Sequence, residues 1–121
     1  MNAGGDMELT AVGHAVLDWI ANHSPDESMR EQLRHVEAMD REFTGVGSFT
    51  GLRVRTDAPR VGFRVAPACP LIQSPQLEHG GGSVLFFEDG HAVMLELYAY
   101  GDSFAEDISE WRLVSDMWPN G

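Results

Sequence analysis

One turn constrains the fold more than any other feature of the sequence. The dipeptide Asp89-Gly90 separates two apolar runs, SVLFFE at 83–88 and HAVMLELYAY at 91–100. Asp-Gly suits the left-handed backbone of a two-residue hairpin turn. The sequence therefore predicts two antiparallel strands joined at this turn.

The second of these strands is predicted to carry two different faces, because successive side chains of a strand point to opposite sides. One parity is entirely apolar and is expected to face the core: Val93, Leu95, Leu97 and Ala99. The other parity is mixed: Ala92, Met94, Glu96, Tyr98 and Tyr100.

Two segments with helical periodicity precede the strands. Apolar residues recur at three- and four-residue spacings over residues 7–23 and again after SPDE, where Ser24 is the expected helix cap. The pattern predicts helices at about 7–23 and 25–40, which a short link makes antiparallel neighbours. Residues 1–6 are expected to form a disordered lead.

From Phe43 onward the pattern is that of strands. FTGVGSFTGLRVR (43–55), VGFRV (61–65) and EWRLVSD (110–116) are each expected to pair in a sheet that covers about residues 43–116. Residues 66–82 are expected to be the longest irregular stretch, with a short edge strand near Leu71 and Ile72. Two helices followed by about five strands predict a single α+β domain over residues 1–121, with two antiparallel N-terminal helices packed on an antiparallel sheet.

The charge of the chain limits its partners. Nineteen acidic residues face eight basic ones, which gives a net charge of −11, and all eight basic residues are arginine. Such a charge repels nucleic-acid phosphates and anionic membrane surfaces, so neither is an expected partner. The acidity has two readings: it keeps the protein in solution, or it forms a face complementary to a basic protein.

Few residues suggest a catalytic, metal-binding or phosphate-binding role. The three glycines at 80–82 precede a strand, and the chain contains no lysine, so a phosphate-binding loop is excluded. Cys69 is the only cysteine, which excludes an internal disulfide and indicates a cytoplasmic protein. His79 and His91 lack the spacing of metal ligands. We predict no catalytic residue, no metal and no cofactor.

The strongest candidate site is the aromatic and acidic exit of the hairpin. We predict that this surface binds a protein partner, with the following residues: Glu96, Tyr98, Tyr100, Asp102, Glu106 and Asp107. Aromatic residues with polar tips are common in recognition surfaces, although they also fill cores. Glu96 has a structural alternative, an ion pair with an arginine of a neighbouring strand: Arg53, Arg55 or Arg64.

Other functions stay open on the same residues. A small-molecule-binding protein or a minor hydrolase would use a pocket near Cys69, His79 and Glu96. A homodimer through an exposed strand edge or an aromatic patch is a further alternative to a monomer.

Three stretches resemble a family of small bacterial proteins of uncharacterised function: REFTGVGSFTGLRV (41–54), LEHGGGSVLFFEDGHAVMLELYAYGD (77–102) and EDISEWRLV (106–114). Its members have motifs similar to REFTGVGFFT and LEHGAGFLLFVEDG, followed by LEGYTYG. The resemblance implies a shared fold and no catalytic residues. By analogy with small acidic immunity proteins, it extends the predicted function to an inhibitor of a basic, toxin-like partner.

Overall fold

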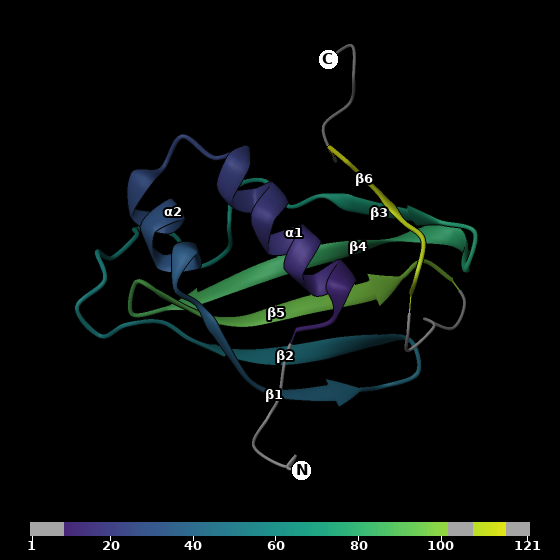
Figure 1. Ribbon diagram of the computed structural model, residues 1–121, viewed down its shortest axis with the longest axis horizontal. Coiled ribbons are helices and arrows are strands. Elements are labelled where there is room, and N and C mark those ends of the chain that lie inside the picture. The colour runs from purple at the N-terminus through teal and green to yellow at the C-terminus, as the bar shows by residue number, and fades with distance from the viewer. Residues whose placement is uncertain (1–8, 102–107, 116–121) are drawn as a thin grey trace.

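The computed structural model describes residues 9–101 and 108–115. Its two helices lie on one face of a six-stranded antiparallel sheet (Figure 1), which confirms the predicted α+β class. The helices are α1 (Ala11–Asn22) and α2 (Glu27–Arg34). The strands are, along the chain, β1 (Glu37–Phe43), β2 (Gly47–Arg53), β3 (Leu71–Ser74), β4 (Leu77–Glu88), β5 (His91–Ala99) and β6 (Arg112–Val114). Across the sheet their order is β1-β2-β5-β4-β3-β6.

Helix α1 begins where the sequence provides a cap and an apolar stripe. The Thr10 hydroxyl accepts a hydrogen bond of 3.1 Å from the Gly13 amide, which satisfies one of the free N–H groups of the first turn. The side of α1 that faces the sheet is fully apolar and buried: Val12, Val16, Leu17 and Ile20. A Cβ at Gly13 would lie 3.2 Å from the Thr10 hydroxyl, so the glycine leaves room for the capping side chain.

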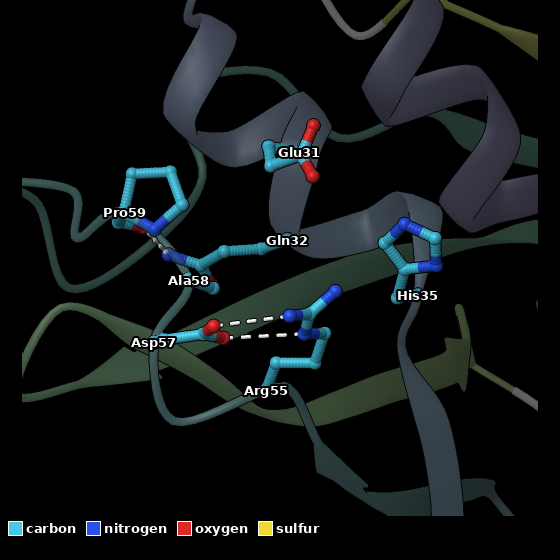
Figure 2. Close-up of a pocket in the computed structure, with 7 residues that line it drawn as sticks. All are labelled: Glu31, Gln32, His35, Arg55, Asp57, Ala58 and Pro59. Atoms are coloured by element: carbon cyan, nitrogen blue, oxygen red, sulfur yellow. Dashed lines mark hydrogen bonds and ion pairs between the residues drawn. The ribbon is translucent and has the colours of Figure 1, made fainter.

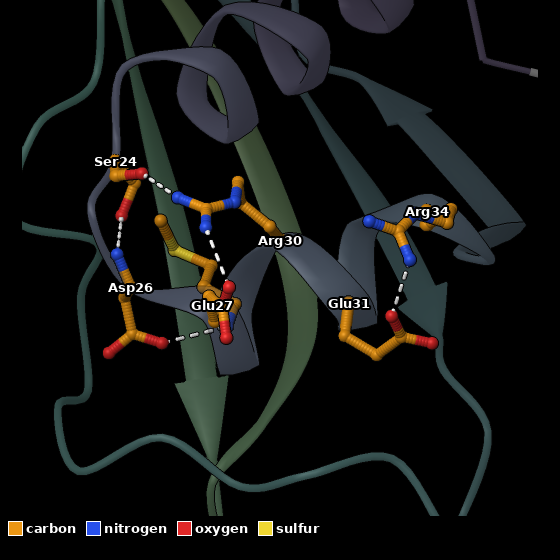
Figure 3. A network of polar contacts seen from close by, with 7 residues as sticks. Ser24, Asp26, Glu27, Arg30, Glu31 and Arg34 are labelled. Atoms are coloured by element: carbon orange, nitrogen blue, oxygen red, sulfur yellow. Dashed lines mark hydrogen bonds and ion pairs between the residues drawn. The ribbon is translucent and has the colours of Figure 1, made fainter.

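The cap of α2 differs from the prediction by two residues. Asp26, rather than Ser24, caps the helix, and its Oδ1 accepts a hydrogen bond of 2.8 Å from the Met29 amide. Ser24 instead accepts a hydrogen bond of 3.1 Å from the Asp26 amide and so fixes the turn before the helix (Figure 3). On the solvent side of α2, Glu27 pairs with Arg30 and Glu31 pairs with Arg34 (Figure 3).

The predicted extension of the second helix to residue 40 is wrong. Helix α2 ends at Arg34, and residues 37–43 form β1, an edge strand that pairs with β2. The apolar spacing of Val36 and Met39 fits a helix, but hydrogen bonding along the free edge of β2 outweighs this weak local preference. The sheet therefore begins at residue 37 and not at 43.

The segment at 61–65 is also not a strand. Val65 makes a single bridge to Phe86, and the irregular stretch of the described chain is the segment from residue 54 to residue 70. Proline and glycine in this segment interrupt the alternation that VGFRV suggests. Strand β3 does occur near Leu71, but it lies between β4 and β6 and is not an edge.

One core lies between the helices and the sheet. Its fully buried side chains come from α1, α2 and the inner face of the central strands: Val16, Ile20, Met29, Ile72, Leu85 and Leu95. Burial of each such side chain contributes about 1.5–3 kcal/mol, so this layer is the main source of stability.

The predicted hairpin is present, and segments outside the hairpin hold its turn in place by hydrogen bonds. Asp89 and Gly90 have φ values of 53° and 85°, as a two-residue turn with left-handed backbone requires. A bulge opposite Phe86 and Phe87 shifts the register of β5 and places Ala92 on the inner face. The predicted face of Ala92 is therefore wrong, because the bulge reverses the alternation at this point.

Gly90→Ala is expected to destabilise the protein more than Gly45→Ala. Both glycines have positive φ, of 85° and 90°, which costs an alanine about 1–2 kcal/mol. A Cβ at Gly90 would also lie 2.6 Å from the Cβ of Arg60, whereas a Cβ at Gly45 meets no atom within 4 Å. Urea unfolding of the two variants measures the difference, and equal losses of stability would contradict the close contact at the turn.

Candidate functional site

The cross-strand pairing defines two faces of the sheet, because directly paired residues of antiparallel strands share a face. Leu95 pairs with Thr50 and Leu85, and this row lies buried under the helices. The residues directly before and after this row on each strand have side chains on the opposite side of the sheet. We call the residues of β2, β4 and β5 on that side the outer face: Phe49, Gly51, Gly82, Val84, Phe86, Met94, Glu96 and Tyr98.

The outer face is apolar although neither α1 nor α2 covers it. Figure 1 shows both helices on the opposite side of the sheet. The larger side chains of the outer face are half-buried, and Val65, bridged to Phe86, extends the apolar surface with 44% of its own area exposed. An antiparallel sheet with one solvated face normally alternates apolar residues inward and polar residues outward. This sheet departs from that pattern on its three central strands.

Glu96 is the charged residue at the centre of the outer face; Arg53 and Glu88 share its side of the sheet only at the ends of β2 and β4. Its cross-strand neighbours are Phe49 and Val84, and its side chain is half-buried between them. It makes no ion pair or hydrogen bond with any residue in the described ranges.

The predicted structural role of Glu96 as the partner of an arginine is thus not supported. Arg53 pairs with Glu37 across β1 and β2 at 2.9 Å, and Arg55 pairs with Asp57 at 3.0 Å. Each of these arginines finds an acid closer in the sequence or on the adjacent edge strand. The carboxylate of Glu96 is therefore left to interact with solvent or with another molecule.

Tyr98 covers a glycine on the neighbouring strand. A Cβ at Gly82 would lie 2.4–2.9 Å from the Oη, Cζ and Cε1 atoms of Tyr98, so the ring lies directly over the Gly82 backbone. An aromatic ring over a cross-strand glycine shields the exposed backbone and fixes the ring. Tyr100, just beyond the end of β5, packs edge-on against Tyr98 with ring centroids 5.5 Å apart.

The environment of Tyr98 keeps its hydroxyl protonated. The pKa of Tyr98 is raised from 10.0 to about 12, mainly by burial, with contributions in the same direction from a hydrogen bond with Tyr100 and from the negative charges of Tyr100, Glu96 and Cys69. Each of these effects disfavours the phenolate. At neutral pH Tyr98 therefore presents an uncharged ring.

The structure places half of the predicted binding residues together. Glu96 and Tyr98 lie on the outer face, and Tyr100 adjoins it with 43% of its surface exposed. Asp102, Glu106 and Asp107 lie outside the described residues. Sequence reasoning missed Phe49, Val84 and Phe86, which complete the apolar surface. The available signal was the run VLFF at 84–87 of β4, in which both parities are apolar.

The residues of the alternative pocket face different surroundings. Cys69 is buried, and its Sγ lies 4.0 Å from the carbonyl oxygen of Ala66. His79 is exposed at the start of β4 and lies close to Gly101, whereas Glu96 is on the outer face. The thiol of Cys69 and the carboxylate of Glu96 thus do not line a common pocket among those found in the described part of the chain.

Acidic residues border the outer face along β1. Glu42 pairs with Phe49, and Asp40 pairs with Gly51 and accepts a hydrogen bond of 3.3 Å from its amide. Both acids are exposed, and with Glu96 they surround Phe49 by negative charge. The site thus combines an apolar, aromatic centre with an acidic border.

A second concave region lies against α2 (Figure 2). This pocket of about 120 Å³ is lined by Glu31, Gln32, His35, Arg55, Asp57, Ala58 and Pro59. Gln32 forms its inner wall, and only 1% of Gln32 is exposed.

The polar groups of Gln32 are used inside the protein. Its Nε2 donates to the carbonyl oxygens of Pro59 at 2.8 Å and Gly90 at 2.7 Å, and its Oε1 accepts from the Ala92 amide at 2.9 Å. Arg55 and Asp57 at the rim bind each other through two hydrogen bonds. The pocket is therefore a by-product of a structural junction.

Within residues 9–101 and 108–115, no group of three or more His, Cys, Asp or Glu side chains is placed to hold a metal ion. No helix in these ranges is long and apolar enough to cross a membrane.

Comparisons of the chain with protein-family models, curated proteins and solved structures found no match. The resemblance to a bacterial family stays a prediction, and the geometry of the outer face is the basis for assigning a function.

Gln32→Leu is expected to lower the free energy of unfolding by about 2–5 kcal/mol. It removes three hydrogen bonds and leaves the Ala92 amide and the Pro59 carbonyl without their Gln32 partner in a buried junction. Gln73→Leu, on the exposed side of β3, is the control and is expected to change stability by less than about 0.5 kcal/mol. Chemical denaturation measures both, and similar values would show that the junction is not important.

Tyr98 and Tyr100 are the only tyrosines of the chain, so absorbance at alkaline pH reports on this pair alone. We expect one tyrosine to ionise with a pKa of about 12. Since this value exceeds the unfolded value of 10.0, the corresponding stabilisation is complete below pH 10 and is lost as the pH rises to about 12.

Tyr100→Phe is expected to lower the pKa of Tyr98 without restoring the ordinary value, because burial is the largest cause and remains. Ionisation of both tyrosines near pH 10 in the folded wild type, followed by absorbance with circular dichroism as a check on folding, would contradict the burial of Tyr98.

Proposed function

We propose that the protein is a non-enzymatic binding module that uses the outer face of its sheet to bind a basic protein. The observation that carries this proposal is that the outer face is apolar on three adjacent strands while both helices lie on the other side. Apolar patches of this kind on otherwise polar surfaces mark interaction sites.

The residue types of the outer face support protein binding. Phe49, Tyr98 and Tyr100 provide rigid aromatic area of the kind that dominates binding energy in protein interfaces. The ring of Tyr98 is already fixed over Gly82, so little conformational freedom is lost on binding.

The charge of the site favours a basic partner. Asp40 and Glu42 border the apolar surface, Glu96 lies within it, and the chain as a whole carries a net charge of −11. Opposite potentials accelerate encounter and suppress wrong partners. A second copy of this chain would instead bring like charges together, which disfavours a homodimer through this face.

In this proposal the protein acts by occlusion, as an immunity or inhibitor protein does. The apolar centre covers a surface of the partner, and the carboxylates select a partner of opposite charge. A single cysteine with a buried thiol fits a module of the reducing cytoplasm.

Charge reversal at the centre of the outer face tests the proposal. The full chain is used as bait in a lysate of its native organism, as wild type, as Glu96→Arg and as Tyr100→Ala. A basic protein held by the wild type is then purified and titrated. We expect Glu96→Arg to raise Kd by about tenfold or more, because it places a cation against a basic surface.

Glu88→Gln is the matched control, because Glu88 is exposed at the hairpin end of β4 and away from the centre of the outer face. It is expected to leave the affinity unchanged. If every captured protein binds Glu96→Arg and Tyr100→Ala as tightly as wild type, or if no basic protein is captured, the proposed face is wrong.

A further inference from the structure

Glu96 has the unusual position of a single carboxylate inside an aromatic and apolar surface. Phe49 and Val84 flank it across the strands, and Met94 and Tyr98 flank it along β5. Burial of a lone carboxylate under an apolar partner surface is costly unless a cation accompanies it. Any protein that covers the outer face must therefore supply a positive group at this position.

The surface beside Glu96 is suited to a flat cation. The Tyr98 ring lies over Gly82, so one face of the ring rests on the sheet and its opposite face is turned away from it. Tyr100 contacts Tyr98 at an interplanar angle of 80° and supports the ring from the side. A guanidinium group can stack on such a ring and donate two hydrogen bonds to a neighbouring carboxylate.

We infer that the outer face recognises an arginine side chain of the partner protein, whose guanidinium pairs with Glu96 and stacks on Tyr98. This inference rests on the proposed function and names the chemistry of the partner's central contact. Arginine is favoured over lysine because the guanidinium is planar and less strongly hydrated, whereas the ammonium of lysine loses more hydration at a half-buried site.

The arrangement of charge supports the same assignment. Tyr98 keeps its proton up to a pH of about 12, so the ring remains a neutral platform beside Glu96. Two arginines of this chain are held by other acids, Arg53 by Glu37 and Arg55 by Asp57, and Glu96 makes no ion pair with any described residue. The carboxylate is thus available to a cation from outside.

The test uses defined peptides and needs no knowledge of the partner. Acetylated pentapeptides with a central arginine, lysine or citrulline between glycines are titrated into the full chain, and backbone amide shifts are followed by NMR. We expect the arginine peptide to shift amides around Glu96 and Tyr98. The lysine peptide should bind about two- to fivefold more weakly, as expected for loss of one exposed stacking contact, and citrulline, which is planar but uncharged, should not bind.

Two variants separate the contact from general charge attraction. Glu96→Gln should weaken binding of the arginine peptide about two- to fivefold, as expected for the loss of one exposed ion pair. Glu88→Gln removes the same charge about 16 Å away along the strands and should have no effect. Thermal unfolding of both variants confirms that the fold is retained.

The outcomes distinguish this inference from the proposed function. Equal binding of the arginine and lysine peptides, equal effects of the two variants, or shifts confined to other acidic surfaces would each overturn the arginine contact. The proposed function would then still be decided by the partner titration with Glu96→Arg. Shifts on the outer face that are strongest for arginine, with binding that is weakened by Glu96→Gln and unchanged by Glu88→Gln, support the contact.

Discussion

The rest of the structure depends on the side chain of Gln32. From the buried side of α2 it reaches two carbonyl groups and one amide, which belong to Pro59 of the loop, to Gly90 of the turn and to Ala92 at the start of β5. It thereby holds helix, loop and hairpin in one arrangement. Because a shift of one residue in strand register would exchange the two faces of the hairpin, this junction also determines that Glu96 and Tyr98 point outward.

The loop opposite Gln32 also fixes the Asp89-Gly90 turn by hydrogen bonds. The Val61 amide donates to the Gly90 carbonyl at 3.0 Å, and a ring nitrogen of His91 lies 3.0 Å from the Ala58 carbonyl. This loop has no regular secondary structure, but its hydrogen bonds hold the hairpin in place. The stability of the protein resides on the helix side of the sheet, and the outer face makes none of these anchoring contacts.

The hairpin, the first helix and the α+β class could be predicted because local sequence determines them: an Asp-Gly turn, a cap and an apolar stripe. The end of α2 could not, since Val36 and Met39 fit a helix and only pairing with β2 makes residues 37–43 a strand. Glu96, Tyr98 and Tyr100 were found by parity along one strand. Phe49 and Val84 belong to the same site through cross-strand register, which no single segment of the sequence contains.

The separation of the two faces has a consequence for how such a protein can change over time. Substitutions at positions such as Phe49, Val84 or Met94 alter what the sheet presents to a partner and leave the Gln32 junction untouched. A lineage under pressure to follow a changing target can therefore vary one side of the sheet while the other side preserves folding. The bulge at Phe86 and Phe87 marks the boundary between these two roles along the hairpin.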